Sequence, residues 1–172
     1  MIKILERFFK PPASEVRRVV ALIDYENIAL ADDAIGKGKI LDFQILKEEL
    51  LKIGNLDFAL VFIPYDMVWG MKDLSELGYD IISCPKRRNS DKLEDKVDIS
   101  IIRTVWKFSR YSEITDIAII SNDRHMLEAV NEAKNNNKKI HLFGILPKMA
   151  VVLKDYVGAE NIKPVPLKNG RA

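Results

Sequence analysis

Three aspartates occupy positions in this sequence where a carboxylate could do chemistry. Asp24 ends the apolar stretch VVALI, with Asn27 three positions later. Asp123 follows a second apolar stretch, and Asp98 stands between two apolar residues. A carboxylate at the end of a buried strand must be hydrogen-bonded, paired or bound to a metal. If the fold brings the three carboxylates together, they repel one another unless a cation lies among them.

Carboxylate oxygens favour Mg²⁺ or Mn²⁺, which keep several waters and leave positions for phosphate. Such an ion activates water and stabilises a developing oxyanion, as phosphodiester hydrolysis requires. Each residue also has a simpler interpretation: Asp123 as a helix N-terminal residue, Asp98 as a solvated first-turn acid, Asn27 as a loop residue. The sequence contains no Gly-rich phosphate loop and no Ser-centred nucleophile elbow.

The elements that would position these residues alternate between strands and helices. The apolar stretches predict strands over Val19–Asp24, Phe58–Pro64, Asp80–Cys84, Ile117–Ser121 and Lys139–Phe143. Helical spacing predicts helices over Phe43–Ile53, Asp66–Leu77, Glu94–Phe108, Asp123–Asn136 and Pro147–Tyr156. This alternation predicts a three-layer α/β/α fold with a mostly parallel five-stranded sheet. Ligands bind beyond the carboxyl ends of such strands, where Asp24 and Asp123 would lie. Trp106 and Phe108 are expected to pack in the core.

Size and composition predict one domain of an ordinary globular kind. The chain has 172 residues, of which 48% are apolar and 30% charged, and a net charge of +2. Nucleic-acid binding would therefore need a local basic patch. The single Cys84 fits a reducing, cytoplasmic compartment, and with two histidines it cannot form a thiolate or imidazole zinc cage. No apolar segment reaches the roughly 20 residues that span a bilayer, so no membrane partner is expected.

We expect residues 1–14 to form an N-terminal amphipathic segment and linker, 15–163 the folded domain, and 164–172 a C-terminal tail. The segment MIKILERFFK would pack on its own domain or on a second chain, so a homodimer is one expectation. A membrane-surface anchor is a weaker alternative, because Glu6 interrupts the basic face. The tail would be a loose extension or a short edge segment.

Three segments, ALIDYENI, DKVDISII and TDIAIISNDRHML, carry polar residues where predicted elements end or begin. In order and spacing they resemble three motifs of NYN domains, a branch of the PIN-like nucleases. Those motifs are F-I-D-x-x-N, K-x-V-D and D-x-x-x-x-x-S-G-D-x-D-F. The resemblance covers roughly Val19 to Phe143. It implies a Rossmann-like PIN fold for residues 15–163, a divalent-metal site and ribonuclease activity.

The resemblance also implies roles for single residues. Asp24, Asp98 and Asp123 would bind Mg²⁺ or Mn²⁺ and serve catalysis. Asn27 would orient water, substrate or a carboxylate. Asp116 matches an acid at the start of the last motif strand, the wrong end for a metal site, so we expect it to be structural.

The sequence departs from the family in the third motif, where S-G-D-x-D becomes S-N-D-R-H. Asn122 replaces the glycine, and His125 replaces the second acid, which lowers the negative charge and should weaken metal binding. His125 would bind metal, act as an acid or base, or simply bond to a neighbour on its helix. Arg124 would contact a substrate phosphate or reduce the negative field. Ser121, Asn122 and His125 are thus further candidate members of the site.

Basic residues gather in the segment CPKRRNSDKLEDK, which follows the third predicted strand. The RNA-binding candidates in it are Lys86, Arg87, Arg88, Lys92 and Lys96, in addition to Arg124. Beside an acidic metal centre they would hold an RNA backbone, although a solvated charged loop is the alternative interpretation. Tyr65 and Trp69, after the second strand, would stack on unpaired bases or cap the core.

The leading hypothesis is a metal-dependent ribonuclease that acts on single-stranded RNA or structured loops. The alternative is a catalytically weak or inactive RNA-binding regulatory module with the same fold, and the change at His125 motivates it. A third hypothesis is a phosphatase or nucleotide hydrolase for small molecules, because the same metal chemistry serves both.

Overall fold

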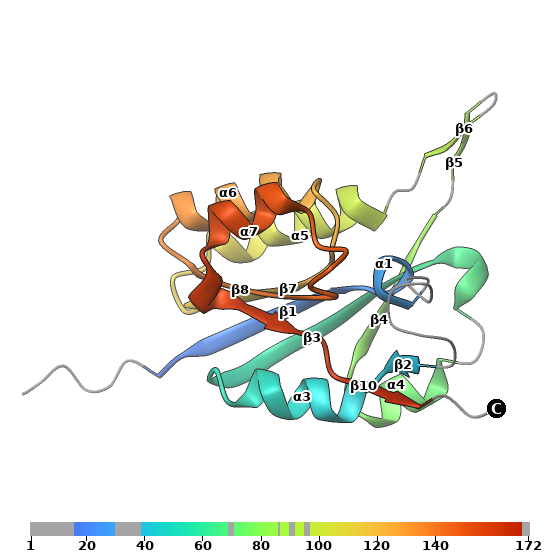
Figure 1. The fold of residues 1–172 in the computed structure, drawn as a ribbon, viewed down its shortest axis with the longest axis horizontal. Coiled ribbons are helices and arrows are strands. Elements are labelled where there is room, and N and C mark those ends of the chain that lie inside the picture. Colours follow the sequence, from blue (N-terminus) through green and yellow to red (C-terminus); the bar gives the residue numbers. More distant parts are fainter. Residues whose placement is uncertain are drawn as a thin grey trace, which may run out of the picture.

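The apolar stretches of the sequence form parallel strands because helices cover both of their faces. The computed structural model describes residues 16–29, 39–68, 71–85, 87–89, 92–94 and 97–169. In this part a parallel sheet with strand order β4-β3-β1-β7-β8-β9 lies between two helical layers (Figure 1). Its strands are β1 (Arg18–Asp24), β3 (Asn55–Pro64), β4 (Asp80–Cys84), β7 (Asp116–Ile120), β8 (Lys139–Gly144) and β9 (Ile162–Pro164). The predicted three-layer α/β fold is confirmed.

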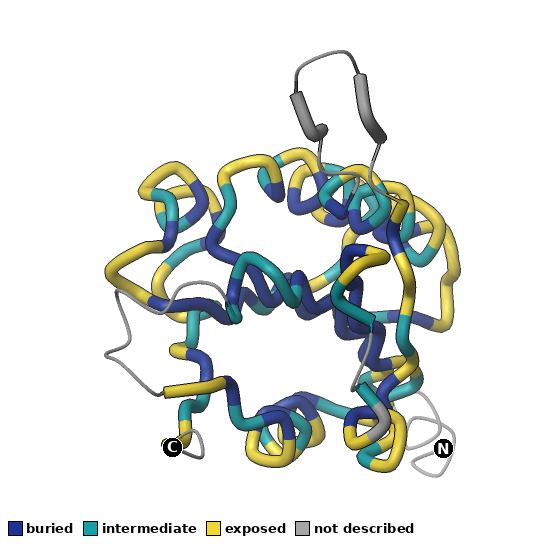
Figure 2. The backbone as a smooth tube through the Cα atoms, turned by 90° about the vertical axis from the view of Figure 1, so that its right-hand side faces the viewer, coloured by how far each residue is buried: buried dark blue, intermediate teal, exposed yellow. Residues whose placement is uncertain are grey.

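The helices divide between the two faces of the sheet (Figure 1). One layer contains α5 (Val97–Ser109), α6 (Met126–Asn135) and α7 (Val151–Val157). The other contains α3 (Phe43–Leu51) and α4 (Lys72–Glu76). The short helix α1 (Tyr25–Ala29) follows β1 without a loop, at the carboxyl end of the sheet. Figure 2 faces this end, with the buried strands at the centre and exposed helix surfaces above and below.

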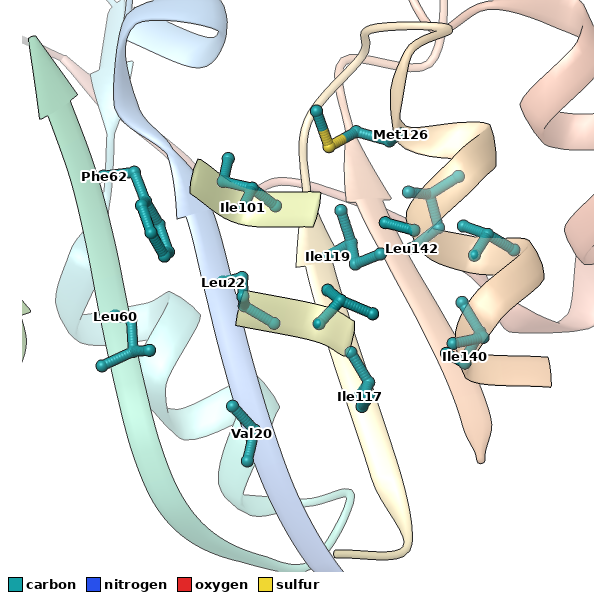
Figure 3. Packing of buried hydrophobic residues seen from close by; sticks show 14 of the residues in the cluster. Val20, Leu22, Leu60, Phe62, Ile101, Ile117, Ile119, Met126, Ile140 and Leu142 are labelled. Atoms are coloured by element: carbon teal, nitrogen blue, oxygen red, sulfur yellow. The ribbon is translucent and has the colours of Figure 1, made fainter. Parts of the chain in front are cut away.

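Two apolar clusters hold the layers together, because neighbouring residues of a strand face opposite sides of the sheet. Figure 3 shows part of one cluster, in which Ile101 of α5 lies among Phe62, Leu22 and Ile119 from three strands. All four side chains are essentially inaccessible to water. Each contributes about 1.5–3 kcal/mol through its burial. This packing fixes the position of α5, which carries Asp98 in its first turn.

The prediction of five strands is wrong, because the parallel sheet has six. The additional strand, β9, pairs with β8 along only three residues. A segment this short lacks the apolar run by which the other strands are predicted. Two small antiparallel pairs join β2 (Lys39–Leu41) to β10 (Leu167–Asn169) and β5 (Arg87–Asn89) to β6 (Lys92–Glu94). The β5–β6 hairpin points away from the body of the molecule (Figure 1).

Several helices differ from the predicted ranges. The structure has a 3₁₀ turn at Tyr65–Met67, and α4 begins only at Lys72. Helix α6 begins at Met126 rather than Asp123, because Asp123 Oδ1 accepts the N–H of His125 at 2.9 Å in a local turn. Trp106 was expected in the core but is 40% exposed, whereas Phe108 packs against the core.

Among the described residues, no helix has both the length and the apolar character needed to cross a membrane. The predicted N-terminal segment, residues 1–14, lies outside the described part of the chain.

Candidate functional site

The carboxyl ends of β1 and β7 place Asp24 beside Ser121. The two strands are parallel neighbours, and Ile23 lies opposite Ile120 in their register. The next residues along the chain are Asp24 and Ser121, and their side chains meet. The Ser121 hydroxyl donates a hydrogen bond to Asp24 Oδ2 at 3.1 Å.

The carboxyl group of Asp24 is buried, with only 3% of the residue exposed. Its Oδ1 accepts the backbone N–H of Asn27 at 3.2 Å, because α1 begins directly after the strand. Burial is the main cause that raises the pKa of Asp24 to about 7, and nearby Asp98 and Asp123 add to it. The hydrogen bonds from Asn27 and Ser121 act in the opposite direction. A cation beside this group would favour its ionised form.

Asn27 and Asn122 tie three strand ends together. Asn27 Oδ1 accepts the backbone N–H of Asn122 at 2.8 Å and its side-chain Nδ2 at 3.1 Å. Asn122 Oδ1 accepts the N–H of Ile145, just after β8, at 2.7 Å. A side chain at Gly144 would obstruct this arrangement, since a Cβ there would lie 2.7 Å from Asn122 Oδ1. Asn122, which stands where the family motif has glycine, therefore connects the ends of β1, β7 and β8.

Asp98, Asp123 and His125 form a group of side chains that could hold a metal ion. One donor atom of each lies within 4.8 Å of the other two. His125 Nδ1 is 3.3 Å from Asp98 Oδ2 and 3.3 Å from Asp123 Oδ1. The His125 side chain is 58% exposed, so an ion could reach the group from solvent. An imidazole nitrogen between two carboxylates either donates its hydrogen to them or shares a cation with them.

The donor chemistry of this group fits a divalent metal. Two carboxylates suit Mg²⁺ or Mn²⁺, and the imidazole nitrogen moves the preference toward a transition metal such as Mn²⁺. Asp24 does not belong to the group of three donors. Asp98 and Asp123 nevertheless lie close enough to Asp24 for their negative charges to raise the pKa of Asp24. A cation held by the three donors would therefore lie in the field of a further carboxyl group.

Asp116 lies at the opposite end of the sheet, as the first residue of β7. The residue is fully buried, and its carboxylate pairs with Arg17 and with His141 Nε2 at 2.7 Å. Thr115 Oγ1 donates a further hydrogen bond at 2.7 Å. Burial alone would raise the pKa of Asp116, but these three partners together hold it well below its ordinary value. This position agrees with the structural role expected for Asp116.

The predicted RNA-binding residues are placed only in part. Arg87 and Arg88 lie in β5 and Lys92 lies in β6, whereas Lys86 and Lys96 lie outside the described residues. The hairpin that these strands form leads into the N-terminus of α5 (Figure 1). Arg124 is exposed in the turn before α6, between two members of the metal-binding group.

A second feature at this end of the sheet is an open hollow of about 320 Å³ beyond β3 and β4. Tyr65, Asp66, Ser83 and Pro85 line it. Tyr65 is largely exposed, so it does not cap the core, and its ring is accessible to a planar ligand. Trp69, the other aromatic residue named for this region, lies outside the described residues.

Comparison with known proteins adds the following. A model of the NYN domain matches residues 18–158. A crystal structure of a protein of unknown function from Vibrio parahaemolyticus is similar, with a TM-score of 0.75 and 13% sequence identity, covering 90% of this chain and 96% of that chain. The C-terminal domain of a hydrogenase from Pyrococcus furiosus has a TM-score of 0.50 and 13% identity, covering 74% and 92%. At such identities the two structures support the fold alone. Among curated proteins, none matches the chain.

Proposed function

The chain belongs to the NYN domain family of PIN-like nucleases, and on this premise we propose that it is a divalent-metal-dependent ribonuclease. Its substrate would be RNA in single strands or structured loops. One observation carries the proposal: Asp98, Asp123 and His125 converge at the sheet end where the buried Asp24 also lies.

In this proposal Asp98, Asp123 and His125 hold Mg²⁺ or Mn²⁺, and Asp24 supplies the third carboxyl group. The bound ion supplies an activated water and positive charge for the phosphate oxyanion. Burial raises the pKa of Asp24 to about 7, and a cation held beside it would favour the ionised carboxylate, which adds negative charge to the site. Asn27 positions the site by donating its N–H to Asp24 and accepting from Asn122.

The substrate would be held by cations and an aromatic ring around this centre. Arg87, Arg88 and Lys92 of the hairpin, with Lys86, Lys96 and Arg124, would contact phosphates. Tyr65 would stack on an unpaired base. A cytoplasmic location belongs to the same proposal, and the single cysteine of the sequence, Cys84, is a buried thiol, as a reducing compartment allows.

A catalytically weak or inactive RNA-binding module is the second candidate. The contact of His125 Nδ1 with both Asp98 and Asp123 favours it. A protonated imidazole in this place would offset the charge of the two carboxylates without any metal. Such a protein would bind RNA through the same cations but would not cut it.

The test is metal-dependent cleavage by the Asp24→Asn variant. Purified protein is titrated with Mn²⁺ and Mg²⁺ on mixed RNA substrates, and products are resolved by gel. Loss of the carboxylate should lower the cleavage rate by roughly 100-fold, since it removes one of the three negative charges around the ion. Asp155→Asn, the same change at an exposed position of α7, is the matched control and should cut as the wild type does.

The outcomes separate the candidates. Cleavage that is unchanged in Asp24→Asn would exclude this site as the catalytic one. RNA binding without metal, together with no cleavage in Mn²⁺, would favour the binding module. Turnover of nucleotides but not of RNA would point to a small-molecule hydrolase.

A further inference from the structure

The outward face of α5 carries a stripe of aromatic, apolar and basic side chains that runs away from the acidic residues. Its members follow one another at helical spacing and are all exposed: Ile99, Arg103, Trp106 and Arg110. Val97, Ile101 and Val105 form the opposite, buried face of the same helix. Trp106 thus points away from the core although tryptophan is a residue that usually buries much of its surface.

Three basic residues lie on or beside this face: Arg103 and Lys107 in α5, and Arg110 directly after it. Within the described part of the chain, Arg103, Lys107 and Arg110 form no ion pair with another residue. The one acidic residue of α5 is Asp98, in the first turn and in contact with His125. Unmatched cations on a helix surface favour a polyanion as the partner over an uncharged protein surface.

A groove of about 580 Å³ lies at the far end of α5, and Lys107, the neighbour of Trp106 in the sequence, lines it. Three aromatic rings lie in a row there. Phe58 and Phe108 have centroids 5.1 Å apart, and Phe108 and Tyr111 have centroids 6.1 Å apart. Phe58 is 42% exposed and Tyr111 is 56% exposed. Lys107, Arg18 and Glu113 also line the groove, and Arg18 is paired with Asp57. Aromatic rings beside cations are the surface on which unpaired bases stack.

We propose that single-stranded RNA lies along α5, from the acidic residues at its first turn to the aromatic groove at its end. This inference rests on the proposed function in taking RNA as the ligand. The helix has 13 residues, which span about 20 Å at 1.5 Å per residue. That length accommodates about six phosphates at the spacing of a stacked strand. Arg103, Lys107 and Arg110 contact these phosphates, and Trp106 and Tyr111 offer their rings to the bases.

The test compares how affinity depends on RNA length. Uridine oligomers of about 4 and about 16 nucleotides are bound to the protein in EDTA, which stops metal-dependent cleavage. The α5 variant is Arg103→Gln with Lys107→Gln and Arg110→Gln. Its matched control is Lys52→Gln with Lys154→Gln and Lys163→Gln, three lysines that lie directly after α3, in α7 and in β9. Circular dichroism checks that both variants are folded.

In the wild type and the control, affinity should rise at least tenfold from the short to the long oligomer, and the α5 variant should lose this gain. The slope of log affinity against log salt concentration for the long oligomer should also fall by about 2 in the α5 variant, at roughly 0.7 per lost phosphate contact. Equal affinities in the α5 variant and the control would overturn the proposal. A change of oligomeric state without a change in RNA binding would overturn it too, by making this face a contact between chains.

A second measurement reports stacking directly. In a Trp69→Phe background, Trp106 is the remaining tryptophan. Its fluorescence should be quenched by the long oligomer and much less by the short one. Absence of quenching at saturating RNA would contradict stacking on Trp106.

These binding results are independent of the nuclease test. If RNA is cut but the α5 variant binds it as the control does, the ribonuclease proposal stands and the α5 path is wrong. If RNA is not cut but binding still depends on the three cations, the path stands and the nuclease proposal fails.

Discussion

The carboxyl group of Asp24 is buried at the end of β1 and accepts hydrogen bonds from Asn27 and Ser121. Burial raises its pKa to about 7, whereas an aspartate in an unfolded chain titrates near about 4. Between these pH values the folded state keeps a proton that the unfolded chain has released. The folded state therefore loses stability as the pH rises through this window.

Asp24→Asn should accordingly stabilise the protein at high pH while it removes activity. At pH ~8 in EDTA the free energy of unfolding should rise by up to about 4 kcal/mol, which corresponds to a pKa difference of about three units, because the amide cannot ionise. At pH ~4 wild type and variant should differ little, since both are then uncharged at this position. Thermal unfolding at the two pH values measures the difference. Equal melting temperatures at the higher pH would show that the native carboxyl group titrates normally.

His125 gives the second prediction for a single residue. Its Nδ1 stands 3.3 Å from Asp98 and from Asp123, where the family motif has a carboxylate. His125→Asp would restore an all-oxygen donor set, which suits Mg²⁺ better than a set containing imidazole. The ratio of Mg²⁺-supported to Mn²⁺-supported cleavage should rise on the order of tenfold. Metal titrations of both proteins measure it, with Arg124→Gln as a neighbouring control. An unchanged ratio would mean that His125 does not contact the ion.

The residues of the site were predictable to different degrees. Asp24 and Asp123 follow apolar strands and match motifs, so the sequence was sufficient to name them as candidates, and their roles remain predictions. The connection made by Asn122 was not predictable, because it depends on β8 lying beside β7 and on the backbone N–H of Ile145. Likewise, the contact of His125 with Asp98 joins residues 27 positions apart on two different helical segments.

Whether an acidic residue can belong to the metal-binding group or only stabilises the fold depends on which end of a strand it occupies. Asp116 begins β7 and is enclosed by Arg17, His141 and Thr115, whereas Asp123 follows the other end of the same strand. Parallel strands bring all carboxyl ends to one edge, so their first residues cannot reach the metal-binding group.

Asp116→Asn should therefore lower the stability of the folded state and leave the cleavage rate unchanged. At neutral pH the change should cost about 2 kcal/mol, because Arg17 loses its ionised partner while remaining partly in contact with water. The low pKa of Asp116 stabilises the native state above pH ~4, and this contribution is lost as the pH falls. The difference in the free energy of unfolding between variant and wild type should thus become smaller at acidic pH. Denaturant unfolding at neutral pH and at pH ~3 tests this, with cleavage by the folded variant as the control.

The strands were predictable where their apolar pattern extended over many residues. The strands β1, β3, β7 and β8 are near-continuous apolar runs, and each was identified. The short strands β2, β5, β6, β9 and β10 have three residues each and gain their order from partners distant in sequence. Trp106 was expected to pack because its helix has a core periodicity, yet it lies on the exposed side of α5, opposite Val97, Ile101 and Val105.

At the scale of the whole molecule, the last described residues complete the side of the sheet that α3 covers. Val165 is buried, and its N–H donates to Gly144 O at 3.0 Å. Pro166 O accepts the N–H of Asp42 at 2.9 Å, and β10 pairs with β2. The boundary of the domain at residue 163 thus remains a prediction that can be tested by truncation.

Removing residues 165–172 should destabilise the whole protein. The loss of one buried valine and of the β10–β2 pairing should lower the free energy of unfolding by about 3 kcal/mol. Thermal unfolding measures it, and a shorter truncation after Asn169 serves as the control. A melting temperature unchanged by the longer truncation would show that residues 164–172 are a dispensable tail.

The amides of Asn27 and Asn122 and the hydroxyl of Ser121 fasten the strand ends to one another by protein–protein hydrogen bonds alone. None of these hydrogen bonds has a cation as a partner. If the proposed ion binds beside them, a chelator should therefore stop cleavage without unfolding the protein, and returning the ion should restore cleavage. The rate of cleavage would then follow the supply of metal while the amount of folded protein stays constant.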